Sequence, residues 1–217
     1  MNLLILGATG GTGRLVVEQA LAAGHTVTAL VRSPEKLAIR NSNLRVVVGR
    51  ATEAADVARA LASADALLST LGGGGSVIAE STGAMIEAAH KAGVRRVVVL
   101  SSFVVERDRL GAVLRLLTGI AMGSMIKDKG AGEQLLRQSD LDWTIIYASL
   151  LKDGPVSGSV EVLPDGAKWR ISDRISRADV AEWMVQAATS SHLSRRSVGI
   201  IGGTRTKEHV EREGSRK

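Results

Sequence analysis

The chain contains no cysteine, only three prolines and only five aromatic residues among its 217 positions. Without cysteine, disulfide bridges, thiolate nucleophiles and cysteine-ligated zinc or iron–sulfur sites are excluded. His25 and His90 lie near the ends of predicted helices, and no histidine has metal-ligand spacing, so we expect no metal site. The scarce aromatics leave few platforms on which single-stranded nucleic acid could stack.

A long hydrophobic run and a strong charge cluster are also missing. The apolar opening, residues 1–6, is too short for a secretory signal peptide, so we expect a cytoplasmic protein. With 45% hydrophobic and 23% charged residues, the composition is that of a globular domain with one core. The net charge of +6 is scattered along the chain, which favours a phosphate-rich small molecule over a specific nucleic acid as the anionic partner.

Short apolar runs rich in Val, Ile and Leu alternate with helical patterns. Runs of this kind, without polar alternation, are typical of parallel strands covered by helices on both faces. Six strands are predicted by these runs: residues 3–6, 26–31, 44–48, 66–70, 96–100 and 143–146. The fold class is therefore α/β, a doubly wound parallel sheet of the Rossmann type.

Glycines and caps mark where the predicted helices begin and end. Gly24 and Gly93 follow helical patterns at residues 12–23 and 77–92, as helix C-termini require. Ser33 followed by Pro34 predicts another helix start, and Ser176 with Asp179 resembles a capping box for a helix over residues 176–189.

The carboxyl-terminal part of the chain has a different texture. After Tyr147 the sequence predicts short β-like pieces at residues 159–163 and 168–171, and a last strand at 197–201. We expect a single NAD(P)-binding domain over residues 1–202, with a small C-terminal extension, 150–202, covering the substrate side. The charged segment 203–217 is predicted to be disordered.

Residues 110–126 form the least regular stretch, with Arg115 as the only charge and three glycines. The stretch is too short for a membrane span, and its glycines argue against a regular helix. We expect a buried cover over a pocket, with Met122 and Met125 as an adaptable wall; contact with a membrane surface or with a second copy are the alternatives.

A glycine-rich loop follows the first predicted strand and precedes a helix. It comprises Gly7, Ala8, Thr9, Gly10, Gly11, Thr12 and Gly13. This spacing suits a dinucleotide: Gly7 allows the tight turn, Gly10 lets the backbone approach a diphosphate, and Gly13 lets helix and strand pack closely.

The residue at the end of the second strand selects the nucleotide. NAD sites usually place an acidic residue there to accept hydrogen bonds from the ribose hydroxyls. Here the position holds Arg32, whose guanidinium can instead grip a 2′-phosphate, and Arg14 is a candidate second cation. The sequence therefore predicts NADP(H) rather than NAD(H).

The ordered motifs resemble a known group of proteins. They are GATGGTGR (7–14), LVRSPEKL (30–37), VVVLSSF (97–103), SDLDWTII (139–146), DGP (153–155) and SRADVA (176–181). The chain is similar up to about residue 201 to the atypical short-chain dehydrogenases of the NAD(P)H-binding, NmrA-like and biliverdin/flavin-reductase-like type. The set is specific to the family but not to one reaction.

The resemblance directs attention to the ends of the middle strands. The usual Tyr four residues before a Lys is absent, because Met125 precedes Lys129 at that spacing. The resemblance implies that Ser102 binds the acceptor or the nicotinamide carboxamide, with Ser101 beside it. Lys129 is implied to bind the nicotinamide ribose or to stabilise a developing anion, although it can also pair with Glu133.

Three further positions need mention. Leu71 and Gly72 follow the fourth strand, where we expect the backbone to approach the adenosine and ribose. Tyr147 and Ala148 replace an Arg-Pro pair common in relatives, and Arg50 replaces an Asp common after the third strand. These departures bear on the nicotinamide and adenine contacts, respectively.

These observations favour an NADPH-dependent oxidoreductase that transfers hydride to a planar acceptor such as a flavin, a quinone or biliverdin. A delocalised anion needs less help from a protein acid than an alkoxide does, which fits the missing Tyr donor. The alternatives are a non-enzymatic NADP(H)-sensing regulator of the NmrA-like type and a sugar-nucleotide-type epimerase or dehydratase. We expect a monomer or homodimer without a transmembrane segment.

Overall fold

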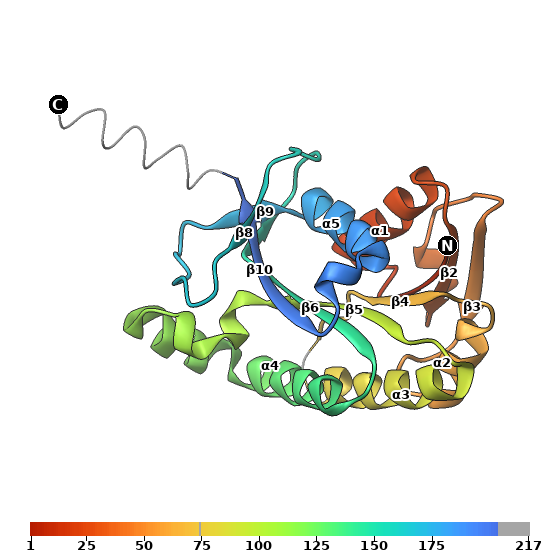
Figure 1. The fold of residues 1–217 in the computed structure, drawn as a ribbon, viewed down its shortest axis with the longest axis horizontal. Coiled ribbons are helices and arrows are strands. Elements are labelled where there is room, and N and C mark those ends of the chain that lie inside the picture. Colours follow the sequence, from red (N-terminus) through yellow and green to blue (C-terminus); the bar gives the residue numbers. More distant parts are fainter. Residues whose placement is uncertain (74, 204–217) are drawn as a thin grey trace.

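A computed structural model of the chain describes residues 1–73 and 75–203. Figure 1 shows a single layered body with the amino terminus at one end of the sheet. The segment predicted to be disordered, residues 203–217, lies outside the described residues from position 204 onward.

The main sheet has eight strands in the order β3-β2-β1-β4-β5-β6-β10-β8. All neighbouring strands are parallel except β8, which pairs with β10 in antiparallel fashion. The strands are β1 (Asn2–Leu6), β2 (Thr26–Val31), β3 (Leu44–Val48), β4 (Ala66–Ser69), β5 (Arg96–Ser102), β6 (Asp142–Ala148), β8 (Val160–Leu163) and β10 (Arg196–Gly202). A separate two-stranded parallel sheet joins β7 (Leu150–Lys152) to β9 (Arg174–Ser176).

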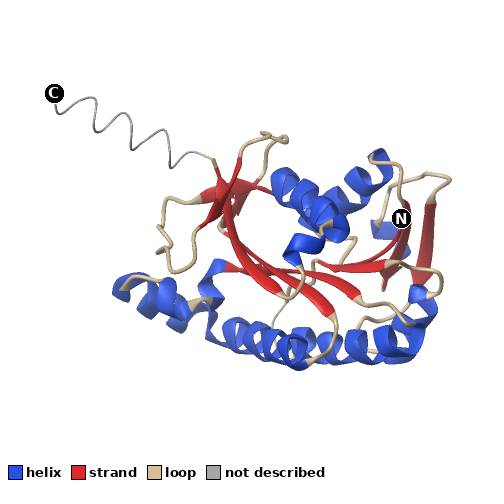
Figure 2. Ribbon diagram, in the orientation of Figure 1, coloured by secondary structure: helices blue, strands red, loops and turns tan. Residues whose placement is uncertain are grey.

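Helices cover both faces of the sheet (Figures 1 and 2). One layer contains α1 (Gly11–Ala22) and α5 (Arg177–Thr189), and the other contains α2 (Ala54–Leu61), α3 (Val77–Ala92) and α4 (Ala112–Gln138). The predicted doubly wound α/β fold is confirmed, and the first six strands lie where the apolar runs indicate. The strand order reverses direction beside β1, which is where such sheets bind ligands at the carboxyl ends of their strands.

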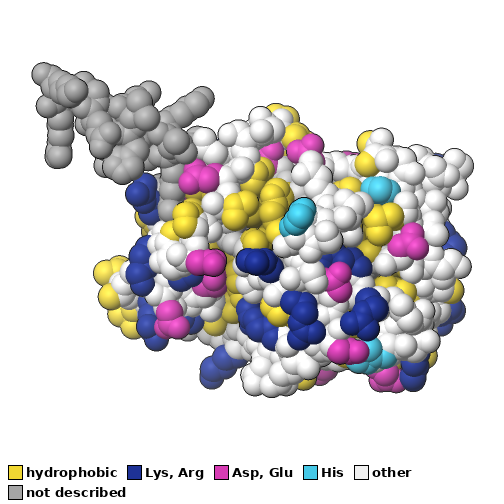
Figure 3. Space-filling model, in the orientation of Figure 1, with side chains coloured by type: hydrophobic (Ala, Val, Ile, Leu, Met, Phe, Trp, Pro, Cys, Tyr) yellow, Lys and Arg dark blue, Asp and Glu magenta, His cyan; other side chains and the backbone are white. Residues whose placement is uncertain are grey.

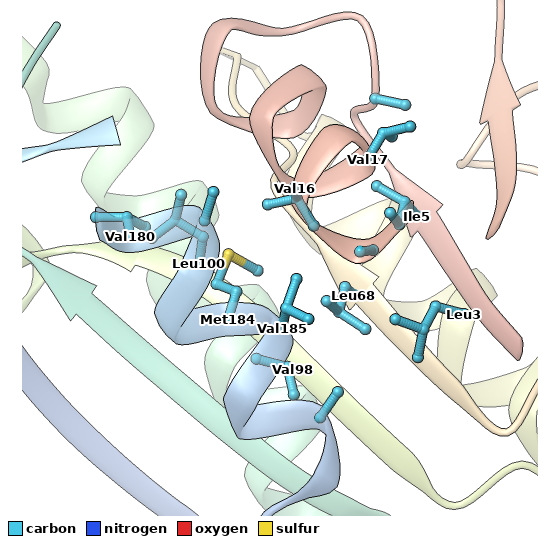
Figure 4. Close-up of a cluster of buried hydrophobic side chains, with 14 of the residues drawn as sticks. Leu3, Ile5, Val16, Val17, Leu68, Val98, Leu100, Val180, Met184 and Val185 are labelled. Atoms are coloured by element: carbon cyan, nitrogen blue, oxygen red, sulfur yellow. The ribbon is translucent and has the colours of Figure 1, made fainter. Parts of the chain in front are cut away.

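The core lies in two layers, one on each side of the sheet. Figure 4 shows the layer beneath α1 and α5, where Val16 and Val17 of α1 face Ile5, and Val180 and Met184 of α5 lie over β5. The central strands β1, β4, β5 and β6 are buried on both faces by these two layers, which explains why their sequences show no polar alternation.

Two predicted elements are wrong. Ser33 and Pro34 begin only a 3-10 helix, Pro34–Lys36, and the Ser33 side chain makes no cap hydrogen bond. Leu37 and Ile39 both pack on the core although they are two positions apart, a spacing that a helix would place on different faces. The connection from β2 to β3 is therefore the one crossover, among the first five, without an α-helix.

The strand predicted at residues 168–171 does not form. Trp169 instead turns inward, donates its indole N–H to Glu106 Oε2 at 2.9 Å, and packs at 5.6 Å from the Phe103 ring. A buried indole N–H requires a partner, and this one lies on a different segment of chain. The strand begins later, at Arg174, and ends at Ser176, whose side chain accepts the N–H of Asp179 at 2.9 Å and caps α5 as predicted.

Residues 110–126 also differ from the prediction, because most of them lie in helix α4. The helix has non-helical φ and ψ angles at Met122, where it is kinked. The absence of a side chain at Gly119 leaves space for Arg107, because a Cβ on Gly119 would lie 3.0 Å from Arg107 Nη2. The Arg107 guanidinium donates hydrogen bonds to the carbonyl oxygen of Arg115 and the hydroxyl oxygen of Thr118. Gly119 accommodates a crossing arginine, and the helix continues through it.

The first half of α4 has two different faces. Leu114, Thr118 and Met122 face the body of the molecule, whereas an outward row is 57–78% exposed, comprising Val113, Leu116, Leu117 and Ile120. The segment is thus a cover on one face only. Figure 3 shows apolar atoms at the end of the molecule where this half of α4 projects. None of the helices among residues 1–73 and 75–203 combines the length and apolarity needed to cross a membrane.

Candidate functional site

Two neighbouring cavities open at the carboxyl ends of the parallel strands. The large cavity has a volume of about 690 Å³ and lies over β5 and β6 beneath the first half of α4. The small cavity, of about 230 Å³, lies over the ends of β2 and β3. Both are bordered by the glycine loop and by Leu71 and Gly72, so together they form one elongated site.

The glycine loop adopts the conformation that its spacing predicts. Gly7 has φ +82°, and a Cβ there would lie 2.7 Å from Thr70 Oγ1. A Cβ on Gly13 would lie 2.0 Å from the Gly7 carbonyl oxygen, so only glycine allows α1 to approach β1 this closely. The N–H of Gly10 donates to the Gly7 carbonyl at 2.9 Å, which closes the turn. The first turn of α1 then directs its unpaired N–H groups toward the site, as a diphosphate requires.

The small cavity combines apolar walls with arginines. Gly7, Thr9 and Arg32 line it, and Arg50 lies on its wall after β3. Arg32 is exposed. Two guanidinium groups bordering a cavity at the end of β2 are suited to a phosphoryl group on an adenosine ribose. Sequence reasoning noted Arg50 only as a departure from the family pattern.

Arg14 is not brought to either cavity. Its side chain is more than half exposed and lies 3.8 Å from Glu18 one turn along α1. The sequence predicts Arg14 near a phosphate because it follows Gly13 directly, but Arg14 is not among the residues that line either cavity. Among the described residues, Arg50 rather than Arg14 accompanies Arg32.

The remaining predicted site residues line the large cavity. They are Gly10, Gly11, Thr12, Gly13, Leu71, Gly72, Ser101, Ser102 and Lys129. Ser102 is half-buried, and no hydrogen bond of its hydroxyl occurs within the described residues. The strand ends thus bring residues more than a hundred positions apart to one wall.

Lys129 projects from α4 into this wall and is 8% exposed. Its ammonium group donates to the carbonyl oxygens of Leu100 at 3.3 Å and Leu71 at 3.5 Å. Burial lowers the pKa of Lys129, while the charges of Glu133 and Asp128 partly oppose that change. The ion pair with Glu133 that helix spacing allows is not among those of the described residues, so the ammonium group faces the cavity.

Glu133 is held elsewhere, by three donors. The Ser101 hydroxyl donates to Glu133 Oε1 at 2.5 Å, the Tyr147 hydroxyl donates to Oε2, and Arg137 Nη1 lies 3.3 Å from Oε2. Arg137 Nη2 also donates to the Tyr147 hydroxyl oxygen at 2.7 Å. Sequence reasoning missed this network, since its members come from β5, α4 and β6.

The only tyrosine of the chain therefore lies in the core. Tyr147 is 3% exposed and does not line the large cavity. Burial and the neighbouring Glu133 carboxylate raise the pKa of Tyr147 well above its ordinary value, and Arg137 only partly offsets this. A hydroxyl this reluctant to ionise does not serve as a proton-abstracting base in the cavity.

Two buried hydroxyls have no hydrogen-bond partner among the described residues. They belong to Ser149, a residue of the large cavity wall, and Ser81, a residue of the small cavity wall, and neither oxygen is accessible from the cavities. Buried polar groups are almost always paired, so each of these hydroxyls carries a cost in stability.

Arg177 is a further cation that sequence reasoning missed. It lines the large cavity, and a Cβ on Gly11 would lie 3.4 Å from its Cδ and Nε atoms. Its Nη1 donates to Asp153 at 2.7 Å. The guanidinium therefore lies over the glycine loop, where a diphosphate would approach. The described residues contain no cluster of His, Asp and Glu suited to a metal ion.

Comparisons with known proteins agree with this geometry. Residues 7–191 match the family model described as NAD(P)H-binding. A photosystem II assembly factor, Ycf39 of Synechocystis, is 26% identical over 93% of this chain, and the match covers 63% of that relative's length. The chain thus corresponds to less than two thirds of that relative.

Two solved structures are similar over nearly the whole chain. A short-chain dehydrogenase/reductase of Veillonella parvula in complex with NADP has a TM-score of 0.80, with 20% identity over 92% of this chain and 93% of its own. The anaerobillin reductase ChuY of Escherichia coli O157:H7 has a TM-score of 0.79, with 26% identity over 93% of this chain and 97% of its own.

Proposed function

The chain belongs to the NAD(P)H-binding family, and on that premise we propose that it is an NADPH-dependent reductase acting on a planar acceptor such as a flavin, a quinone or a tetrapyrrole. The observation that carries the proposal is that two adjoining cavities have linings of different chemistry. The small one has Arg32 and Arg50, and the large one has an apolar volume bordered by Ser102 and Lys129.

The choice of NADPH rests on charge. Arg32 has the fork of donors that holds a ribose 2′-phosphate, and no acidic residue replaces it at the end of β2. Arg50 adds a second positive charge to the same cavity wall. Thr9, the glycine loop and Arg177 would hold the rest of the phosphates.

The choice of a planar acceptor rests on the large cavity. Its lining includes Phe103, Leu114, Met122 and Ile171, which offer flat apolar contact at about 690 Å³. When bound, the cofactor supplies the hydride. The Lys129 ammonium group would then stabilise the negative charge that develops on the acceptor, and Ser102 would orient it. The similar protein ChuY is, by its name, an anaerobillin reductase, which is consistent with a reductase.

The test is NADPH oxidation by the purified chain with FMN, menadione and biliverdin as separate acceptors. We expect oxidation above the protein-free rate with at least one of them. Lys129→Met should lower that rate by about 10- to 100-fold, as expected when a charge-stabilising group is removed. Arg14→Ala, outside both cavities, is the matched control and should leave the rate unchanged.

A second candidate is a non-enzymatic NADP(H)-sensing regulator. The observation that favours it is the withdrawal of Tyr147 into the core, which leaves the large cavity without a tyrosine acid. The same observation counts against a sugar-nucleotide epimerase or dehydratase, since oxidising an alcohol requires a base that this Tyr does not provide. NADPH binding without turnover of any of the three acceptors would favour the regulator.

A further inference from the structure

A buried polar network lies behind the wall of the large cavity and has no part in the roles proposed above. Its centre is the Glu133 carboxylate, which is 5% exposed. Its donors are Ser101, Tyr147 and Arg137, with distances of 2.5 Å to the Ser101 hydroxyl and 3.3 Å to Arg137. Of these four side chains, only Ser101 borders the cavity.

The direction of the Ser101 hydrogen bond follows from counting protons. Arg137 remains charged, and the raised pKa of Tyr147 means that its hydroxyl keeps its proton and donates it. Glu133 is thus surrounded by donors, because its Oε1 accepts from Ser101 and its Oε2 accepts from Tyr147 and Arg137. Carboxylate oxygens accept hydrogen bonds, so the single proton of the Ser101 hydroxyl points at Glu133.

Because Ser101 lines the large cavity, the hydrogen-bonding capacity that it has left for a ligand there consists of lone pairs. A serine hydroxyl has one proton and two acceptor sites. With its proton directed at Glu133, Ser101 can accept a hydrogen bond from a ligand but cannot donate one. The ligand group opposite Ser101 must accordingly carry an N–H or O–H.

We propose that Glu133 is a positioning residue that holds Ser101 as a hydrogen-bond acceptor for the carboxamide N–H of the nicotinamide ring. This inference rests on the proposed function, since it requires the reactive end of the cofactor to lie in the large cavity. The carboxamide amide is a donor on that end of the cofactor. Its recognition would fix the rotation of the ring over the cavity wall.

A cofactor analogue without the donor separates this role from a structural one. In the 3-acetylpyridine analogue of NADP⁺ a methyl ketone replaces the carboxamide, so the carbonyl acceptor remains and the N–H donor is lost. By calorimetry, the wild-type chain should bind NADP⁺ about five- to tenfold more tightly than the analogue, as one hydrogen bond with an otherwise unpaired partner implies.

Two variants should abolish that preference. In Glu133→Gln the amide oxygen can accept from Tyr147 and Arg137, which leaves the amide N–H₂ to donate to Ser101. The Ser101 proton then turns toward the cavity, where a carboxamide and a methyl ketone both present a carbonyl. The ratio of the two dissociation constants should fall to about one, and Ser101→Ala should give the same ratio.

The matched control is Ser197→Ala. Ser197 accepts from Arg137 at 3.2 Å at the far end of the network and does not border the large cavity. Its removal should leave the preference for NADP⁺ intact. A general loosening of the fold would weaken both cofactors equally and leave the ratio unchanged, so the ratio reports the hydrogen-bond direction.

The outcomes are distinguishable. If NADP⁺ binds but the wild-type chain does not prefer it to the analogue, or if Glu133→Gln and Ser101→Ala retain the preference, this inference is wrong and the proposed function stands. If neither NADP⁺ nor NADPH binds, both fall together. If Glu133→Gln does not fold, the Ser101→Ala ratio decides alone, because Ser101 lies at the cavity wall.

Discussion

The two cavities of this site are built in different ways. The small cavity obtains its charge from Arg32 and Arg50, which follow strand ends and are not part of the buried core, whereas the large cavity is backed by buried groups of the core. Lys129 and Glu133 are each almost fully buried and hydrogen-bonded to other elements. We therefore expect substitutions at the small cavity to alter cofactor selectivity with little effect on the fold. Substitutions of the buried groups behind the large cavity should alter both the activity and the free energy of unfolding.

The largest effect is expected in the glycine loop, because both cavities share it. A substitution there should therefore change cofactor binding and stability together. In Gly13→Ala the new Cβ would lie 2.0 Å from the Gly7 carbonyl oxygen, which forces α1 away from β1. We expect loss of measurable NADPH binding by calorimetry and a lower free energy of unfolding. Gly83→Ala within α3, where a Cβ meets nothing within 4 Å, should instead stabilise the chain by about 0.5–1 kcal/mol.

The next largest effect, on NADPH affinity, is expected at the small cavity. Arg32→Asp should weaken NADPH binding by about 10- to 100-fold, the range for a lost charge-assisted hydrogen bond, and should strengthen NADH binding relative to it. The midpoint of urea unfolding should hardly change, because Arg32 is exposed. Arg14→Asp is the control, and a loss of NADPH affinity as large as that of Arg32→Asp would contradict the assignment.

The third prediction concerns Lys129 and the cost of burying its charge. Because its pKa is lowered in the folded state, the unfolded chain binds more protons between that value and the ordinary 10.5. The free energy of unfolding should therefore rise with pH in this window for the wild-type chain. Lys129→Met should be more stable by about 1–3 kcal/mol at pH 7, the cost of an incompletely compensated buried polar group.

Urea unfolding at pH 7 and pH 9.5 checks this prediction. The stability gap between Lys129→Met and the wild-type chain should narrow at the higher pH, since the wild-type ammonium group is then partly deprotonated. Tyr147 is present in both proteins, so its titration cancels in the gap. If the difference in free energy of unfolding between Lys129→Met and the wild-type chain does not change with pH, burial does not destabilise the charged form of Lys129.

The smallest effect is expected at Ser149, a residue of the large cavity wall whose buried hydroxyl has no hydrogen-bond partner among the described residues. Ser149→Ala should raise the free energy of unfolding of the ligand-free chain by about 1 kcal/mol, since an unsatisfied buried hydroxyl is removed. Ser176→Ala is the matched contrast: it removes a paired helix cap and should destabilise the chain by about 1 kcal/mol.

The regular part of the fold could be predicted because its signals are local. Strands β1 to β6 are continuous apolar runs, and Gly24 and Gly93 have the positive φ angles that their positions after helices suggest. The cap of α5 lies within four residues of sequence. The pieces that could not be predicted depend on distant partners: Trp169 turns inward toward Glu106, and α4 persists through Gly119 because Arg107 crosses it.

The site residues show the same difference between features with local sequence signals and features that depend on distant partners. The glycine loop and Arg32 follow from spacing along the chain, and the end of β5 together with α4 brings Ser101, Ser102 and Lys129 to one cavity. Arg14 does not line either cavity, because adjacency to Gly13 does not fix the direction of a helical side chain. The sequence did not predict the contact of Glu133 with Ser101 or the place of Arg177, since Glu133 binds a serine 32 positions earlier and Arg177 reaches a loop at the opposite end of the chain.

The partition between the cavities has a thermodynamic consequence. Leu71 and Gly72 border both, and the Leu71 carbonyl oxygen is held by Lys129. Anything that displaces this shared stretch of backbone on one side alters the other side as well. The two ends of a dinucleotide should therefore bind non-additively: the affinity for nicotinamide mononucleotide should depend on whether adenosine 2′,5′-bisphosphate already occupies its half.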